Sequence, residues 1–398
     1  MTTTMQRIRL AERMSRLGTE SAFDVLVRAR ELEAAGKEVI HLEIGEPDFP
    51  TAPHIVEAAA KALRDGWTHY GPPAGLPQLR EAIAQDVAAR RGIKVDPSEV
   101  VVTPGAKPIM FFTILALVEP GDEVLCPNSG YPIYDSMVNF VGARPVSYPL
   151  PESSDFDLDV NEVISRITER TRLLILNSPH NPTGGVLSPA QIKALAEALD
   201  SPKGRDVVIL TDEIYNRLIF EGEHASLTRF HSMKERTILL DGFSKTFAMT
   251  GWRLGYGVMP PPLAKHVAQL MTNSNSCTAS FTQIAGVAAL RGDQGPVEAM
   301  RAEFMRRRKV IVDGLNSIPG FRCRLPHGAF YAYPNITGTG RNSRELADAL
   351  LNEAGVACLS GTAFGTWGEG FLRFSYANSV ENISKALDRI KGWTKKNL

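Results

Sequence analysis

An alternation of short apolar runs and helical segments fills the middle of the chain and leaves few folds open. Each run is nearly all apolar and is bounded by proline, glycine or aspartate, as expected for strands buried on both faces of a parallel sheet. The runs are residues 100–102, 123–126, 173–176, 207–210, 238–240 and 256–259. Helical periodicity lies between them, for example at residues 110–118 and 189–199. The pattern predicts a doubly wound α/β domain whose mostly parallel sheet is flanked by helices.

The two ends of the chain have a different pattern. We expect long amphipathic helices at residues 297–315, 343–353 and 380–393, with short strands between them at 328–333 and 371–375. This indicates a smaller α+β domain. Near the start, a helix at 23–35 and a short strand at 39–44 are expected. We predict three parts: an N-terminal segment 1–48 that joins the small domain, a large ligand-binding domain 49–290, and a small C-terminal domain 291–398.

Charge and apolar content exclude several classes of function. Lysine plus arginine number 44, as do aspartate plus glutamate, so the basic excess typical of nucleic-acid binders is missing. The one dense basic run, residues 306–308, is expected on a solvated helix face. No apolar stretch approaches the roughly 20 residues that span a membrane, and the N-terminus lacks the features of a signal peptide. A cytoplasmic protein with no nucleic-acid or membrane partner is predicted.

The spacing of cysteine and histidine argues against disulfides and metal sites. The eight histidines never form His-Glu-x-x-His or another ligand spacing, so no metal is predicted. The cysteines lie far apart, which indicates buried thiols in a reducing compartment. They are Cys126, Cys277, Cys323 and Cys358.

Polar loops follow four of the predicted strands. Ligands of a doubly wound sheet bind beyond the carboxyl ends of its strands, so these loops are expected to meet at one rim. They are residues 103–107, 177–184, 212–215 and 241–245.

Lys245 follows one apolar strand and precedes the apolar residues Phe247–Met249. Most lysines lie on the surface, but a desolvated lysine loses its charge and becomes a nucleophile that forms a Schiff base with an aldehyde. Ser244 and Arg253 add a hydroxyl and a forked cation suited to phosphate. An aldehyde with a phosphate indicates pyridoxal phosphate.

Asp212 ends another apolar run, where a carboxylate is costly unless a cation pairs with it. A helix cap or a nearby cation would account for it, and so would a protonated pyridine nitrogen, which would keep the cofactor an effective electron sink. Tyr215, three residues later, would donate to the phenolic oxygen of the cofactor. Small residues at 105–107 precede a helix and favour an anion, although many tight turns look the same.

A set of short motifs is spread along most of the chain. They are residues 45–49, 70–75, 121–124, 177–184, 212–215, 244–253, 328–331 and 373–376. Together these stretches resemble the class I aminotransferases, which are fold type I pyridoxal-phosphate enzymes, and in particular their bacterial aspartate aminotransferase branch. They recur in family order from about residue 40 to 380, and their joint occurrence is far more specific than any one of them.

The resemblance implies catalytic and cofactor-binding roles. Lys245 would hold the cofactor as an aldimine and move the substrate proton, Asp212 would pair with the pyridine nitrogen, and Tyr215 would contact the phenolic oxygen together with Asn181. Tyr131 would stack on the ring. Tyr70 would reach the cofactor phosphate of a neighbouring subunit in a homodimer. The remaining phosphate contacts would come from Gly105, Ala106, Lys107, Ser244 and Arg253.

The resemblance also implies a substrate site. Arg373 would clamp the α-carboxylate with its bidentate fork, although a structural ion pair is the ordinary role of such an arginine. Lys107 would bind a distal carboxylate or would serve only through its backbone, and both remain open. The implied substrate-binding set is Gly45, Tyr131, Asn181, Arg373 and Lys107.

The predicted reaction moves an amino group from an L-amino acid, with aspartate as the best choice, to a 2-oxo acid such as 2-oxoglutarate. Departures from the branch at Pro108, around Tyr131 and at 273–277 leave the substrate open. An aromatic aminotransferase and a β-eliminating carbon–sulfur lyase are alternatives. A ligand-sensing regulator is disfavoured, because the segment before residue 40 of this chain is short and not basic. A nucleotide-binding protein is disfavoured because no glycine-rich phosphate loop follows a strand here.

Overall fold

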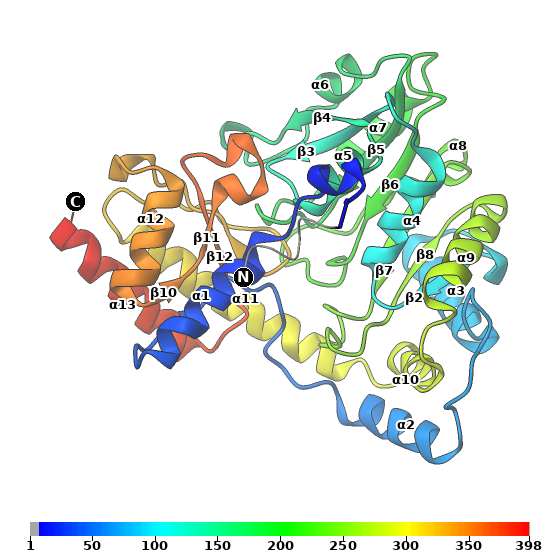
Figure 1. Ribbon diagram of the computed structural model, residues 1–398, viewed down its shortest axis with the longest axis horizontal. Coiled ribbons are helices and arrows are strands. Elements are labelled where there is room, and N and C mark those ends of the chain that lie inside the picture. The colour runs from blue at the N-terminus through cyan, green and yellow to red at the C-terminus, as the bar shows by residue number, and fades with distance from the viewer. Residues whose placement is uncertain (1–7, 398) are drawn as a thin grey trace.

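The computed structural model describes residues 8–397. A central sheet has the strand order β2-β8-β7-β6-β5-β3-β4 (Figure 1). All neighbouring strands are parallel except β8, which runs antiparallel to both β2 and β7. The strands are β2 Val100–Thr103, β3 Glu123–Asn128, β4 Arg144–Pro149, β5 Thr171–Asn177, β6 Val208–Asp212, β7 Thr237–Gly242 and β8 Gly255–Val258. The expected mostly parallel sheet is confirmed.

Strand β4 was not among the predicted strands. It lies at the sheet edge, where it pairs only with β3. Its sequence contains Pro145 and Pro149, and it is less buried than the inner strands. Proline is tolerated at an edge because one side of such a strand needs no ladder donors, so its pattern differs from that of a buried strand.

Helices cover both faces of the sheet. Side chains alternate between the faces along each strand. On β5, Leu173 and Ile175 pack with α4, α5 and α9, whereas Leu174 and Leu176 pack with α6 and α7 on the other side. A third core joins β2 and β7 to α2, α3 and α10. These helices and the short α8 are α2 Pro53–Arg64, α3 Pro77–Arg91, α4 Lys107–Leu117, α5 Ile133–Phe140, α6 Val160–Ser165, α7 Pro189–Leu199, α8 His231–Lys234, α9 Pro261–Asn275 and α10 Ser280–Arg291.

A smaller group of elements packs around its own core beside the sheet. Strand β1 near the start pairs in parallel with β10. The antiparallel set is β11-β12-β9. The elements are α1 Ser21–Ala34, β1 Ile40–His41, α11 Gly295–Asn316, β9 Tyr331–Ala332, α12 Ser343–Ala349 with a π-helical continuation Leu350–Ala354, β10 Val356–Ala357, β11 Leu359–Ser360, β12 Leu372–Ser375 and α13 Val380–Asn397.

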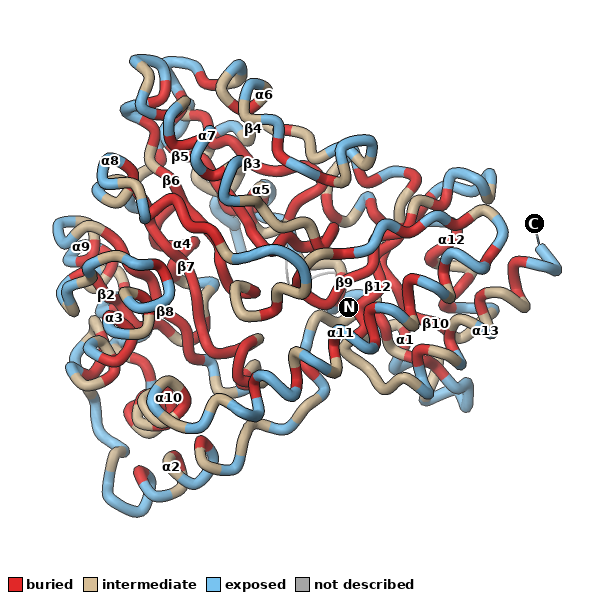
Figure 2. The backbone as a smooth tube through the Cα atoms, turned by 180° about the vertical axis from the view of Figure 1, so that it is seen from behind, coloured by how far each residue is buried: buried red, intermediate tan, exposed pale blue. Residues whose placement is uncertain are grey.

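The division into three parts remains a prediction in its boundaries, and residues 1–7 of the N-terminal segment lie outside the described residues. The pairing of β1 with β10 supports the placement of that segment. Figure 2 shows the central strands as buried backbone and the outer helices with exposed stretches. No helix among residues 8–397 combines the length and apolar character needed to cross a membrane.

The basic run on α11 is not a solvated face. Arg306 points to solvent, but Arg307 and Arg308 are buried. Arg307 Nη1 lies 2.6 Å from Asp48 Oδ1, and Arg308 Nη2 lies 2.6 Å from Glu221 Oε1. Helix α11 packs on both groups of elements, so three successive residues cannot all face water. Among the cysteines, Cys277 is only half-buried, whereas the other three are buried.

Candidate active site

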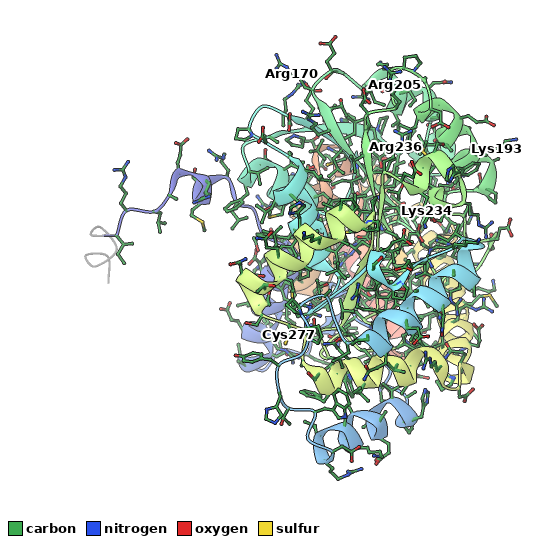
Figure 3. The ribbon with its side chains drawn as sticks, turned by 90° about the vertical axis from the view of Figure 1, so that its right-hand side faces the viewer. Arg170, Lys193, Arg205, Lys234, Arg236 and Cys277 are labelled. Atoms are coloured by element: carbon green, nitrogen blue, oxygen red, sulfur yellow. The ribbon has the colours of Figure 1, made fainter. Side chains whose placement is uncertain are left out.

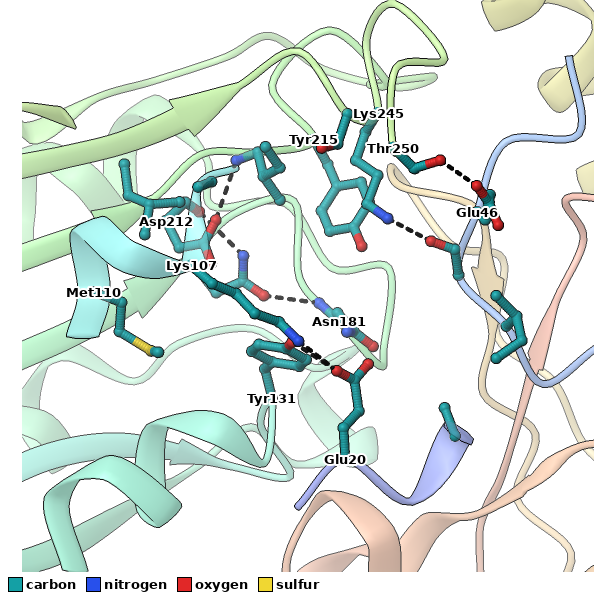
Figure 4. Close-up of a pocket in the computed structure, with 18 of the residues that line it drawn as sticks. Glu20, Glu46, Lys107, Met110, Tyr131, Asn181, Asp212, Tyr215, Lys245 and Thr250 are labelled. Atoms are coloured by element: carbon teal, nitrogen blue, oxygen red, sulfur yellow. Dashed lines mark hydrogen bonds and ion pairs between the residues drawn. The ribbon is translucent and has the colours of Figure 1, made fainter. Parts of the chain in front are cut away.

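A cavity of about 490 Å³ opens at the carboxyl ends of β6 and β7, facing β9 and β12 (Figure 4). The polar loops predicted to meet at one rim contribute to its walls. Of the predicted site residues, all but Gly105 and Tyr70 line it: Gly45, Ala106, Lys107, Tyr131, Asn181, Asp212, Tyr215, Ser244, Lys245, Arg253 and Arg373.

Lys245 lies just beyond β7, and its Nζ donates a hydrogen bond to the carbonyl oxygen of Gly45. Burial of the ammonium lowers its pKa to about 8, although Glu20 and Glu46 oppose the shift. About a tenth of Lys245 is therefore a neutral amine at pH 7, the form that attacks an aldehyde.

Asp212 ends β6 and is buried. The Tyr134 hydroxyl donates to its Oδ2 at 2.7 Å, and the Ile214 N–H donates to its Oδ1 at 3.2 Å. Burial raises the pKa of Asp212 to about 6 despite these two hydrogen bonds. No cationic side chain among the described residues pairs with it, so its environment fits a cationic ring nitrogen of a bound group.

The loop after β2 enters α4 beside Arg253, at the place where the sequence predicts the cofactor phosphate. Gly105 has a φ of +88°, and a Cβ there would lie 2.2 Å from Arg253 Nη2, so a larger residue would collide with that guanidinium. Helix α4 begins at Lys107, directly after Ala106, and the free N–H groups of its first turn favour an anion. Ser244 and Arg253 line the same cavity. Gly105 thus contributes by allowing Arg253 to approach.

Arg373 projects from β12 into the cavity and is buried. Its Nη1 donates to Asn181 Oδ1 at 3.1 Å, and its Nη2 donates to the carbonyl oxygen of Glu43. No described carboxylate forms an ion pair with it. A buried guanidinium without a counterion fits the carboxylate of a bound substrate better than a structural ion pair.

Tyr331, Tyr134 and Glu20 line the cavity but are not among the predicted site residues. Tyr331 lies in a stretch that carried the resemblance, and its hydroxyl is 2.8 Å from that of Tyr215. A Cβ on Gly45 would lie 2.0 Å from the Tyr331 oxygen, which explains why glycine stands there. Tyr134 stands three residues after Tyr131, in the first turn of α5. Glu20 gave no signal, because the helix it precedes has no motif of this site.

Tyr70 is 88% exposed and lies outside the cavity of its own chain. The role expected for it belongs to a neighbouring subunit, and that role stays a prediction.

The comparisons with known proteins agree with this geometry. The family described as aminotransferase class I and II matches residues 37–390. An aspartate aminotransferase of Pyrococcus horikoshii is 40% identical over 385 residues, which is 96% of each chain. An aromatic-amino-acid aminotransferase of Thermococcus litoralis is 39% identical over 357 residues, covering 89% of this chain and 91% of that protein. The solved aspartate aminotransferase of Rhizobium meliloti superposes with a TM-score of 0.93 at 35% identity, covering 98% of this chain and 99% of that one.

This chain therefore belongs to the class I and II aminotransferases. It has the fold of that class, fold type I of the pyridoxal-phosphate enzymes. The protein is a transaminase that depends on pyridoxal phosphate and acts on an amino acid and a 2-oxo acid, as expected from the sequence.

Proposed function

We propose that this transaminase uses L-aspartate as amino donor and 2-oxoglutarate as acceptor, in a homodimer located in the cytoplasm. The observation that carries the choice of dicarboxylic substrates is a pair of cations on the cavity wall, Arg373 and Lys107. A dicarboxylate has one negative group for each, and a charge-assisted hydrogen bond to each end would orient it. Aspartate aminotransferases among the relatives support the same choice.

Bound pyridoxal phosphate supplies an aldehyde carbon for the amino group and a ring that takes up the electron pair left when the α-proton departs. Residues of this chain would transfer the proton and hold the cofactor ring. Lys245, once neutral, would accept the substrate α-proton at Nζ and then donate it to the aldehyde carbon of the cofactor. Asp212 would keep the ring nitrogen protonated, and Tyr215 with Asn181 would hydrogen-bond to the ring oxygen.

Substrate position would be set by Arg373, which holds the α-carboxylate while Gly45 leaves room beside it. Tyr131 would lie against the cofactor ring. Ser244, Arg253 and the N–H groups at 105–107 would hold the phosphate, so that the ring stays in place while the substrate exchanges.

An aromatic substrate is a second candidate, and one contact favours it. Lys107 Nζ already pairs with Glu20 Oε2 at 2.8 Å, so its charge is compensated before a substrate binds. A relative named as an aromatic-amino-acid aminotransferase is consistent with that alternative.

The first test is the absorption spectrum of purified enzyme with bound cofactor, titrated with L-aspartate in the absence of an acceptor. We expect the yellow band to disappear and to return when 2-oxoglutarate is added. Loss of the band with phenylalanine but not with aspartate would replace the proposed donor by an aromatic one. A protein that takes up no pyridoxal phosphate would contradict the whole assignment.

The homodimer is tested by sedimentation of the holoenzyme and by Tyr70→Phe. We expect a dimer, and weaker retention of pyridoxal phosphate on dialysis of the variant, because the Tyr70 hydroxyl would contact the phosphate in the neighbouring subunit. A monomer with full cofactor retention would overturn this part of the proposal.

A further inference from the structure

Glu20 directly precedes α1, yet its side chain makes no capping hydrogen bond to that helix. The carboxylate turns into the cavity instead (Figure 4). Its Oε2 lies 2.8 Å from Lys107 Nζ and accepts a hydrogen bond from the Tyr131 hydroxyl at 2.9 Å. Burial alone would raise the pKa of Glu20, but Lys107 and Tyr131 hold it below its ordinary value, so the carboxylate is ionised.

Lys107 and Tyr131 are the groups that would meet the far end of a substrate side chain. A distal carboxylate needs a cation and a hydroxyl donor, and here one oxygen of Glu20 occupies both. Two carboxylates on one ammonium repel each other, so both cannot keep this contact at full strength. A neutral side chain has no such conflict and leaves the pair between Glu20 and Lys107 intact.

We propose that Glu20 is a specificity-determining residue that competes with the distal carboxylate of dicarboxylic substrates for Lys107 and Tyr131. The proposal rests on the function proposed above. Free enzyme with Glu20 in place binds neutral substrates directly. Acidic substrates bind only the fraction of molecules in which Glu20 has left Lys107, so their apparent affinity is reduced by that fraction.

The surroundings of Glu20 allow it to leave. Its side chain is 21% exposed, and no helix cap is broken when it rotates. The preceding 3₁₀ turn η2, Glu12–Arg16, contains no buried residue and projects from the body (Figure 3). Gly18 holds the backbone through two hydrogen bonds with the Ser136 hydroxyl, at 2.9 and 3.1 Å. Rotation of the Glu20 side chain is therefore sufficient to free Lys107, and α1 does not have to move.

The test measures binding of succinate to the holoenzyme by calorimetry, because succinate has two carboxylates and no amino group to react. Butyrate, with one carboxylate and a similar length, is the matched ligand. We expect Glu20→Gln to tighten succinate about tenfold, if Lys107 is free in about one molecule in ten of the wild type, and to leave butyrate unchanged. Glu12→Gln, in the same exposed segment, is the control and should change neither affinity.

Two further variants keep the test decisive. Glu20→Ala should tighten succinate like Glu20→Gln, which separates loss of charge from an effect of the amide. In a Lys107→Met background, Glu20→Gln should no longer tighten succinate. Unchanged or weaker succinate binding in both Glu20 variants, or equal tightening of succinate and butyrate, would overturn the proposal. Tightening of succinate in an enzyme that does not use aspartate would support the role of Glu20 and contradict the proposed donor.

Discussion

Asp212 and Glu213 are neighbours at the end of β6 and are both buried, but they lie in opposite electrostatic surroundings. Asp212 faces the cavity, accepts hydrogen bonds from Tyr134 and one backbone N–H, and has a pKa raised to about 6 by burial. Burial would also raise the pKa of Glu213, but Arg91 at 2.7 Å and His224 at 3.0 Å lower it well below its usual range.

Arg91 and Lys245, the buried cations near Glu213 and Asp212, differ in the same way: one is paired with carboxylates and the other is not. Arg91 has no exposed surface and pairs with both Glu213 and Asp241, and these carboxylates outweigh burial and raise its pKa. Among residues 8–397, Lys245 has only a backbone carbonyl as hydrogen-bond partner, and its pKa is lowered to about 8. The buried cluster around Arg91 completes its ion pairs within the fold. In the cavity, no described side chain of opposite charge pairs with Asp212, Lys245 or Arg373, so a cofactor or substrate completes them.

The largest loss of activity is expected from substitution of Lys245, the cation without a carboxylate partner. Lys245→Ala removes the base and the nucleophile, and we expect transamination to fall about 10⁴-fold, the upper range for a positioned proton-transfer group. Thermal unfolding of the cofactor-free protein should not become easier, because a desolvated ammonium is lost. The exposed Lys265→Ala is the control. A variant that retains near-normal turnover would remove Lys245 from its role.

The second effect concerns the paired carboxylate. Glu213→Gln leaves Arg91 short of a partner in the interior, and we expect about 3–5 kcal/mol of lost stability at pH 7, measured by urea unfolding. Because the folded pKa of Glu213 is lowered, its contribution exists above the ordinary glutamate pKa and disappears as pH falls through the folded value. The difference should shrink in acid. Exposed Glu235→Gln should cost almost nothing, and an equal loss there would contradict the comparison.

Substitution of the neighbouring Asp212 should change stability in the opposite direction to Glu213→Gln. Asp212 has a folded pKa raised from 3.8 to about 6, so folding binds a proton and stability falls as pH rises through that window. Asp212→Asn should stabilise the cofactor-free protein by up to about 3 kcal/mol at pH 8 and by little at pH 4. Unfolding curves at both pH values test this. Destabilisation at pH 8 would mean that Asp212 is paired after all.

The smallest effect is expected at the hydroxyl that supports Asp212. Tyr134→Phe removes a hydrogen bond to the ionised carboxylate, and we expect pyridoxal phosphate to dissociate about five- to tenfold more readily, the equivalent of one good hydrogen bond. Tyr148→Phe is the matched control, because that buried hydroxyl donates at 2.8 Å to the carbonyl oxygen of Ile175. Equal changes in cofactor affinity would show that Tyr134 acts only through packing.

Much of the fold was predictable, because it depends on local patterns. The six strands expected from apolar runs all occur, and helices occur where periodicity indicated α4, α7, α11 and α13. The reversed direction of β8 was not predictable, since an apolar run has no direction. Arg307 was misassigned for a similar reason: its partner Asp48 is 259 residues away.

Residue type and position along the chain were enough to indicate Lys245 and Asp212 as candidates, because each stands at the end of an apolar strand. Arg373 was indicated only by the family resemblance, since its local setting is equally typical of a structural ion pair. The tertiary structure alone decided which charges are paired. Arg91 and Glu213 are 122 residues apart, and Glu20 and Lys107 are 87 apart. Burial and Coulomb attraction act through space, so the pairing of a charge depends on the folded arrangement around it and not on its neighbours in the chain.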